Sequence, residues 1–415
     1  MLASAKITLL VGGSIAAYKS AELARRLIQS GAEVQVAMSQ AACKFITPIT
    51  FETLTGSPVY TDMFDVRGGS NMAHIDLAND VDAIVVAPAT ADLIARTRAG
   101  MADDLLTAIL LATKAPRLFV PAMNANMWES AITQDNVSAL KTYGVHFVEP
   151  EFGELSCGWV GKGRLADHEV ILQEVMSLIS DKTLMGSHVI VAAGPTREWI
   201  DPIRFVTNNS SGKMGYSIAK VARYRGAHVS LVSGPTGLVP PTGVDFYEVS
   251  TAEQMRQRVM KLAESGPPLA RDKSSKPTKF IFMVAAVCDH RPADVSATKV
   301  KFDKSKEYSL KMIPNPDILR ELGERREELQ RSSDCKLRLI GFTAETGDVE
   351  ELLMWAKEKM EKKSADLMVA NVAQDAFGKD TNRVWMLHRT GREEEISTAD
   401  KEDVADRIIK AALRC

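Results

Sequence analysis

The chain has 415 residues, enough for two or three domains, so the burial of a hydrophobic core is not limiting. Its 51 Lys and Arg residues nearly balance 53 Asp and Glu residues, which favours small-molecule partners and argues against nucleic acid or a membrane. The five cysteines are scattered and lack C-x-x-C spacing, so they indicate neither disulfides nor a zinc site and predict reduced thiols in the cytoplasm. No apolar run approaches the ~20 residues that a membrane span needs.

Apolar runs alternate with helical segments in the first 150 residues. Strands are expected at 7–13, 32–39, 81–90 and 117–124, and helices at 21–31 and 105–115. Around the first helix, Ser20, Leu23, Ala24 and Leu27 fall on one side at the helical period. The run at 7–17 is also compatible with the apolar region of a signal peptide, but a strand entering a glycine turn explains it equally well.

The same alternation starts again after residue 187. Strands are expected at 189–194, 227–234, 280–287, 337–345, 365–372 and 384–388, with a helix from Gly215. Apolar strands separated by helices predict a doubly wound parallel sheet, so the sequence predicts two α/β domains, at 1–184 and 185–415. The segment 264–279 is rich in Pro, Ser and Lys, and it is expected to be a surface excursion without chemistry.

Polar residues follow several strands of the first half. Gly12 and Gly13 end a strand, Ser14 begins a helix, Ser39 follows the second strand, and 88–92 follow a third. Doubly wound folds bind ligands at the carboxyl ends of strands, and helix N-termini favour phosphate. A glycine turn that binds no ligand is as compatible with this pattern as a phosphate-binding turn is. His74 and Asn124 are further candidates, although such residues are more often structural.

The second half contains NNSSGKMG at 208–215, directly before an amphipathic helix. The segment does not match the P-loop pattern, but its backbone amides can converge on a phosphate. A solvated lysine in a polar turn is an equal alternative. Lys359 and Lys363 are four residues apart on a predicted helix, so they share a face that either binds phosphate or is an ordinary basic surface beside Glu358 and Glu361.

Several separated motifs together resemble a known family. GSIAAYK at 13–19, HIDL at 74–77, APATAD at 87–92, PAMN at 121–124 and CGWVGKGRL at 157–165 resemble the flavin-dependent cysteine decarboxylases. DPIRFVTNNSSGKMG at 201–215 resembles phosphopantothenate-cysteine ligase, so the chain resembles the bifunctional coenzyme A biosynthesis proteins of bacteria over nearly its full length. The resemblance implies an N-terminal flavodoxin-like flavoprotein and a C-terminal Rossmann-like ligase, and it is weakest near residue 270 and at the carboxy-terminal tail.

For the first half, the resemblance implies FMN and the substrate 4'-phosphopantothenoylcysteine. The FMN contacts it implies are Gly13, Ser14, Ile15, Ser39, Thr90 and Ala91. His74 would act as a base or positioning group, and Asn124 would hold the amide or carboxylate of the substrate. Cys157 would return a proton to the product from a glycine-rich, basic flap at 157–165, although a free cysteine is more often a small buried hydrophobe.

For the second half, the resemblance implies that CTP activates 4'-phosphopantothenate as an acyl-cytidylate, which cysteine then attacks. Asn208 would orient this intermediate, and Arg204 and Lys213 would bind anionic groups of the substrate. The nucleotide contacts implied are Met283, Val284, Ala285, Asp289, Lys299, Asn315, Pro316, Asp317, Ile318, Phe342, Lys359 and Lys363. Mg²⁺ is implied by the nucleotide, without assigned ligands. Cys288 and His290 depart from the alanine and aromatic residue of the family pattern.

Two other functions compete with this hypothesis. A two-domain flavin or nicotinamide oxidoreductase is disfavoured because neither glycine turn supplies G-x-G-x-x-G with an acidic residue after the next strand. A flavin-binding interaction protein is disfavoured because His74, Asn124 and Cys157 are all present. The family also implies a homo-oligomer.

Overall fold

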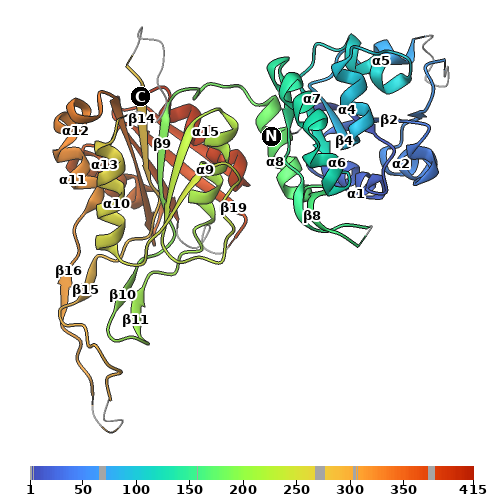
Figure 1. Ribbon diagram of the computed structural model, residues 1–415. Helices are drawn as coiled ribbons and strands as arrows, with labels where there is room; N and C mark the ends of the chain where they lie inside the picture. Colours follow the sequence, from blue (N-terminus) through green and yellow to red (C-terminus); the bar gives the residue numbers. More distant parts are fainter. Residues whose placement is uncertain are drawn as a thin grey trace. The chain divides into compact units, whose positions relative to one another are not determined.

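The computed structural model describes residues 2, 4–64, 72–156, 158–266, 276–301, 305, 307–372 and 379–415. Cys157, the expected proton donor, lies outside these ranges. Contacts between residues divide the chain into two compact units, Met1–Ser180 and Asp181–Cys415 (Figure 1). Each unit has its own sheet and its own core.

The sheet of the first unit is entirely parallel. Its strands, in spatial order, are β3 (Val59–Tyr60), β2 (Glu33–Met38), β1 (Lys6–Val11), β4 (Ala83–Ala89), β5 (Arg117–Pro121) and β6 (Val145–Phe147). The chain therefore runs outward from β1 to one edge, returns to β4, and runs to the other edge. In such sheets the turns that follow the two central strands diverge and leave a crevice at their carboxyl ends.

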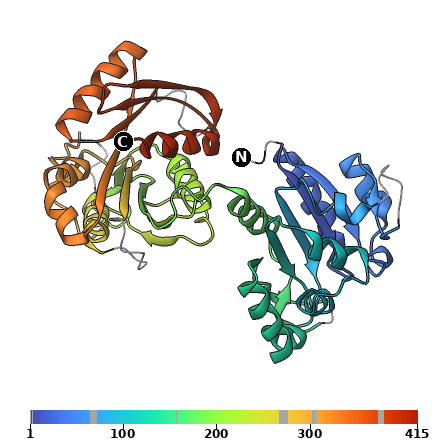
Figure 2. The same cartoon turned by 90° about the horizontal axis from the view of Figure 1, so that it is seen from above.

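Helices cover both faces of this sheet (Figure 2). One face packs against α1 (Ala17–Gln29), α2 (Pro48–Thr55) and α8 (His168–Ile179). The other packs against α3 (Ala73–Asp76), α4 (Ala91–Arg98), α5 (Leu105–Ala112) and α7 (Ala131–Thr142), with α6 (Ala125–Glu129) beside α7. The predicted apolar side of α1 is confirmed, since Ser20, Leu23, Ala24 and Leu27 are buried and the Ser20 hydroxyl donates to the Ala87 carbonyl at 2.6 Å.

The sheet of the second unit is mixed. Its spatial order is β13 (Asp245–Glu248), β12 (His228–Ser233), β9 (His188–Ala193), β14 (Thr278–Met283), β17 (Lys336–Glu345), β18 (Leu367–Val372), β19 (Thr381–His388) and β20 (Glu393–Asp400). The strands from β13 to β18 are parallel, whereas β19 and β20 are antiparallel to their neighbours. The predicted strand at 384–388 exists, but it closes the sheet as part of an antiparallel hairpin.

Two groups of helices cover this second sheet. On one side lie α10 (Ala252–Glu264), α11 (Ile318–Glu324), α12 (Arg326–Ser333) and α13 (Val349–Lys362), and on the other α9 (Lys213–Tyr224) and α15 (Lys401–Ala412) (Figure 1). Two small antiparallel pairs project from one end of the sheet: β10 (Arg197–Trp199) with β11 (Phe205–Thr207), and β15 (His290–Pro292) with β16 (Met312–Pro314). They arise from the chain that follows β9 and β14.

The remaining predictions from composition concern membranes and cysteines. Within the described ranges, no helix is long and apolar enough to cross a bilayer. The described cysteines, Cys43, Cys288, Cys335 and Cys415, carry free thiols. Of the excursion expected at 264–279, residues 267–275 lie outside the described ranges, while α10 ends at Glu264 and β14 begins at Thr278.

A buried histidine makes the second unit sensitive to acid. The His188 ring is 4% exposed and contacts the Ser230 hydroxyl at 2.9 Å. Burial, followed by the nearby His228 and Lys279, lowers the pKa of His188 to about 3. Between pH 3 and 6.5 the unfolded chain therefore binds a proton that the folded chain excludes, so stability falls as the pH falls through 6.5.

We expect His188→Asn to remove this part of the pH dependence. Relative to the variant, the native chain should lose about 2 kcal/mol of unfolding free energy between pH 7 and 5, measured by urea unfolding. Exposed His290 provides a matched control, and His290→Asn should keep the native slope. Parallel pH profiles for the native chain and His188→Asn would contradict the assignment.

Candidate active sites

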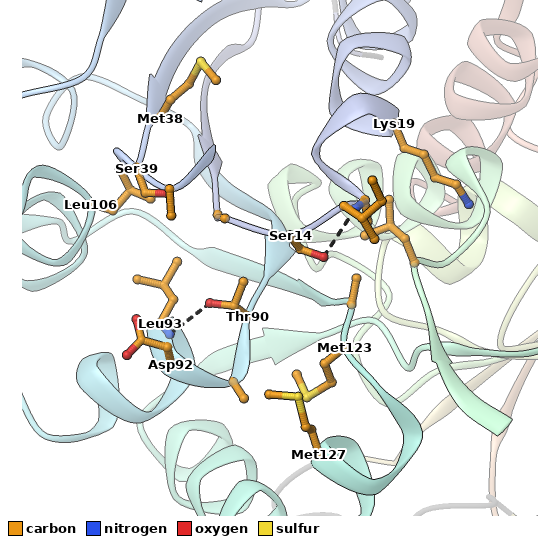
Figure 3. A pocket seen from close by; sticks show the side chains of 18 of the residues that line it. Ser14, Lys19, Met38, Ser39, Thr90, Asp92, Leu93, Leu106, Met123 and Met127 are labelled. Atoms are coloured by element: carbon orange, nitrogen blue, oxygen red, sulfur yellow. Dashed lines mark hydrogen bonds between the residues drawn. The ribbon is translucent and has the colours of Figure 1, made fainter. Parts of the chain in front are cut away.

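The first unit contains a cavity of about 1190 Å³ at the carboxyl edge of its sheet. Its walls come from the turns that follow β1, β2, β4 and β5 (Figure 3). The predicted residues that line it are Gly13, Ser14, Ile15, Ser39, Thr90, Ala91 and Asn124. The structure therefore brings together residues from four separate turns, as expected for the carboxyl ends of parallel strands.

Three hydroxyl groups hold the turns in this wall. Ser14 Oγ accepts from the Ala16 amide at 3.3 Å, and Ser39 Oγ accepts from the Ala42 amide at 3.1 Å. Thr90 caps α4 by accepting from the Leu93 amide at 3.1 Å (Figure 3). Because each hydroxyl accepts from the backbone, its own proton can be donated to an oxygen of a ligand.

Close backbone contact fixes the turn after β1. A Cβ atom on Gly12 would lie 2.4 Å from the Pro88 carbonyl oxygen, and one on Gly13 would lie 2.4 Å from Ala41 Cβ. The Gly12 amide also donates to the Pro88 carbonyl at 3.2 Å. Glycine is needed here because the β1 and β4 turns touch each other, and this contact brings the turns that carry Ser14 and Thr90 to one cavity.

His74 is not brought to this cavity. It lies in the short helix α3 and is not among the described residues that line the wall. Its Nδ1 atom is buried and has no hydrogen-bond partner within the described ranges. The predicted role of His74 therefore has no support from the walls of the cavity and stays a prediction.

Asn124 is positioned by a helix start and by a hairpin. Its Oδ1 atom accepts from the Asn126 amide at 2.9 Å and caps α6. The hairpin of β7 (Glu151–Glu154) and β8 (Val160–Arg164) contains most of the expected flap. The Met123 amide donates to the Gly163 carbonyl at 3.0 Å, and a Cβ on Gly163 would lie 2.2 Å from the Met123 carbonyl oxygen. In this conformation the flap glycines therefore allow β8 to pack on the turn that carries Asn124.

The basic residues near the flap have acidic neighbours. Lys162 pairs with Glu149 at 2.6 Å, and Arg164 lies 3.7 Å from Glu151. Arg164 and Lys19 both line the cavity, and burial together with the charge of Arg164 lowers the pKa of Lys19. The sequence analysis did not single out Lys19 as a site residue, although it lies within the GSIAAYK motif.

The second unit contains a cavity of about 520 Å³. It lies between the start of α9 and the carboxyl ends of β14, β17 and β18. The predicted residues that line it are Asn208, Lys213, Met283, Val284, Ala285, Asp289, Asn315, Pro316, Asp317, Ile318, Phe342, Lys359 and Lys363. Residues more than 150 positions apart in the sequence thus meet in one cavity.

The loop before α9 is anchored to the strand-end turn at 284–289. Asn208 Nδ2 donates to the Ala286 and Val287 carbonyls at 3.3 and 3.1 Å. Gly212 has φ of 76°, a conformation that glycine adopts easily, and its Cβ would lie 2.8 Å from Thr236 Cγ2. This geometry places the start of α9, including Lys213, in the wall of the cavity.

Carboxylates accompany the lysines of this cavity. Lys213 contacts Asp380 at 2.6 Å, Lys359 contacts Glu345 at 2.5 Å, and Lys363 contacts Asp317 at 3.0 Å. Lys359 and Lys363 line the same wall, which confirms the shared face inferred from their spacing. An entering polyanion would compete with these carboxylates for the ammonium groups.

Arg204 and Lys299 do not line the second cavity. Arg204 lies 3.5 Å from the fully buried Asp201 and donates to the Val300 carbonyl at 3.3 Å. Lys299 is exposed on the segment that follows β15. In this conformation the structure therefore separates both residues from the other predicted nucleotide and substrate contacts.

The two departures from the family pattern have different surroundings. Cys288 is buried, its amide donates to Thr196 Oγ1 at 3.0 Å, and its carbonyl accepts from Asn315 Nδ2 at 2.8 Å. Burial raises the pKa of the Cys288 thiol. His290 is exposed at the start of β15. Cys288 thus belongs to the cavity wall, where hydrogen bonds hold its amide and its carbonyl.

Sequence reasoning missed several residues of this wall, among them Thr343, Asn371, Asn382 and Lys401. A lysine at the start of a helix carries no pattern that distinguishes it from a surface residue.

Within the described ranges, no group of three or more His, Cys, Asp or Glu side chains could hold a metal ion.

Comparisons with known proteins cover both units. The family model "Flavoprotein" matches residues 1–180, and "DNA/pantothenate metabolism flavoprotein C-terminal domain" matches residues 184–415. The chain is 40% identical to the coenzyme A biosynthesis bifunctional protein CoaBC of Bacillus subtilis (strain 168), over 99% of this chain and 97% of that protein. It is 39% identical to the protein of the same name from Mycolicibacterium smegmatis, over 99% of this chain and 97% of that protein.

The chain belongs to the family of coenzyme A biosynthesis bifunctional proteins. The resemblance inferred from the separated motifs is thereby confirmed over nearly the full length. Among solved structures, the chain is similar to the C-terminal domain of a coenzyme A biosynthesis bifunctional protein CoaBC. The identity is 36%, the match covers 57% of this chain and 97% of that chain, and the TM-score is 0.43.

The contact between β8 and the Asn124 turn can be tested in this family member by a pair of alanine substitutions. Gly163→Ala must displace the Met123 carbonyl, so we expect a loss of about 1–3 kcal/mol in unfolding free energy of the first unit. Gly153 lies on the neighbouring strand with its nearest neighbour atom 3.7 Å from the added Cβ, so Gly153→Ala should change stability by less than about 0.5 kcal/mol. Chemical denaturation measures both, and equal effects would refute the tight contact.

Proposed function

We propose that this chain performs two consecutive steps of coenzyme A biosynthesis, ligation in the second unit and decarboxylation in the first. The observation that carries the proposal is the pair of separate cavities, each lined by the motif residues of its own unit. Relatives that align over 99% of the chain are named as bifunctional, which supports one activity for each cavity. The reactants are 4'-phosphopantothenate, cysteine and CTP.

The ligase step needs activation, because a carboxylate has no usable leaving group. Attack of the phosphopantothenate carboxylate on the α-phosphorus of CTP forms an acyl-cytidylate and releases pyrophosphate. The cysteine amine then attacks the acyl carbon, forming the amide and releasing CMP. Lys359 and Lys363 suit the phosphates of CTP, and the amide group of Asn208 is placed to orient the acyl-cytidylate.

The cytidine portion of CTP would lie against Asp289, residues 315–318 and Phe342. Mg²⁺ would be held mainly by the phosphates and water, since the described residues offer no protein-only cluster. Arg204 and Lys299 keep their proposed roles only if the segments that carry them approach the cavity when substrates bind.

The first cavity suits FMN. Ser14, Ser39 and Thr90 present hydroxyl groups from three strand-end turns, and the touching backbones of Gly12 and Pro88 shape the cradle between them. When bound, the flavin would supply reversible two-electron chemistry: loss of the thiol proton and of a Cβ hydride would turn the cysteine side chain of 4'-phosphopantothenoylcysteine into a thioaldehyde, which can accept the electron pair left when CO₂ departs, and the hydride would return to the resulting enethiol.

The residues of this unit would orient and protonate the substrate. Asn124, held at the start of α6, would position its carboxylate or amide, and Lys19 and Arg164 would favour its anionic groups. Cys157 is proposed to donate the proton that accompanies return of the hydride to the enethiol, which gives 4'-phosphopantetheine. His74 is proposed as a base or positioning group, and a homo-oligomer in the cytoplasm is proposed from the family resemblance.

Two measurements on one sample test this function. The purified chain should absorb in the flavin region, at about 370 and 450 nm. It should also release pyrophosphate when phosphopantothenate, CTP, Mg²⁺ and cysteine are added. A colourless protein would remove the flavin proposal, and an absence of CTP-dependent pyrophosphate release would remove the ligase proposal.

The proposed phosphate contact of Lys363 has a close internal control. Lys363→Met should raise the KM for CTP roughly 10- to 100-fold, because a charge-assisted contact with phosphate is lost. Lys362 is the adjacent residue, but its side chain is 69% exposed and pairs with Glu358, so Lys362→Met should keep the native KM. Steady-state pyrophosphate release gives both values, and similar effects of the two substitutions would argue against a specific contact.

A further inference from the structure

Lys401 is a buried cation in the wall of the second cavity. It is the first residue of α15, and only 6% of its surface is exposed. The residue nevertheless lines the cavity together with Lys213, Asn371 and Asn382. Burying an ammonium group is costly unless acceptors or an anion compensate it, so this position calls for a physical reason.

The surroundings of Lys401 link it to Lys213. Lys401 Nζ donates to the Lys379 carbonyl, and the Lys401 amide donates to the Asp380 carbonyl at 3.0 Å. The Asp380 carboxylate in turn contacts Lys213 Nζ at 2.6 Å. Burial, and then the charge of Lys213, lowers the pKa of Lys401. Two lysines from α9 and α15 therefore gather at one end of the cavity.

We infer that Lys401 is a further substrate-binding residue of the proposed ligase site, where it and Lys213 hold one phosphate group. This inference rests on the proposed function. The Asp380 side chain is 87% exposed, so a phosphate can compete with it for Lys213 without uncovering a buried carboxylate. The backbone groups at residues 379 and 380 keep Lys401 in place while it does so.

The lysines of this cavity form two pairs that come from opposite faces of the sheet. Lys213 and Lys401 belong to α9 and α15, whereas Lys359 and Lys363 lie in and directly after α13. The proposed reaction has two substrates with separate phosphate groups, the triphosphate of CTP and the phosphate monoester of phosphopantothenate. Either can supply the phosphate at Lys213 and Lys401, and kinetics with each substrate varied in turn identifies which.

The test compares Lys401→Met and Lys401→Arg with a matched control, Lys220→Met. Lys220 also joins α9 to α15, through Glu402 at 2.8 Å, but it does not line the cavity. In pyrophosphate-release assays, Lys401→Met should raise the KM of one phosphate-bearing substrate about 10- to 100-fold and leave the KM of cysteine unchanged. Lys401→Arg should restore most of this loss, and Lys220→Met should match the native chain.

Native KM values for both phosphate-bearing substrates in folded Lys401→Met, checked by circular dichroism, would overturn the inference. Equal KM changes in Lys401→Met and Lys220→Met would also overturn it, because they would indicate helix packing alone. Calorimetric binding of inorganic tripolyphosphate separates this inference from the proposed function. If the native chain releases no pyrophosphate, the ligase proposal fails. Weaker tripolyphosphate binding by Lys401→Met than by the native chain would still support phosphate binding by Lys401, and equal binding would refute it.

Discussion

Close backbone contact between strand-end turns is the constraint on which both sites depend. In the first unit a side chain on Gly12 would overlap the Pro88 carbonyl, and in the second a Cβ on Gly212, which lines the cavity, would lie 2.8 Å from Thr236 Cγ2 and 3.4 Å from Gly194 Cα. Such contact is possible only without a Cβ atom, and it draws turns from neighbouring parallel strands together at one edge of the sheet. The polar groups on those turns then face a common cavity before any ligand enters.

The two cavities differ in the groups that this arrangement presents. The first combines the hydroxyls of Ser14, Ser39 and Thr90 with apolar side chains such as Met38 and Leu106, a mixture that suits a flat ring system with polar edges (Figure 3). The second is lined by lysines that approach from helices on both faces of its sheet, a distribution that suits several phosphate groups. The carboxyl edges of the two sheets in this chain therefore form two chemically distinct cavities.

Most of this organisation could be predicted from the sequence, because parallel strands place all of their following turns at one edge. That rule brought Ser14, Ser39 and Thr90 to one cavity, whereas Lys359 and Lys363 reach the other from the C-terminal end of α13, where their four-residue spacing predicted a shared face. Strand order depends on pairing between segments distant in the sequence, and the antiparallel direction of β19 and β20 depends on how the chain turns between consecutive strands. Periodicity records neither. Arg204 and Lys299 lie between the strands of the two small antiparallel pairs and do not line the wall. The burial of Lys401 accompanies packing between α9 and α15, which no local pattern shows.

A single chain is proposed to carry out ligation and decarboxylation in turn. The most direct measurement is mass spectrometry of the products formed by the purified chain from 4'-phosphopantothenate, cysteine, CTP and Mg²⁺. We expect 4'-phosphopantetheine, with CO₂, CMP and pyrophosphate released in equal amounts. If phosphopantothenoylcysteine accumulates and is never decarboxylated by a protein that retains its flavin, the claim for the first unit is contradicted.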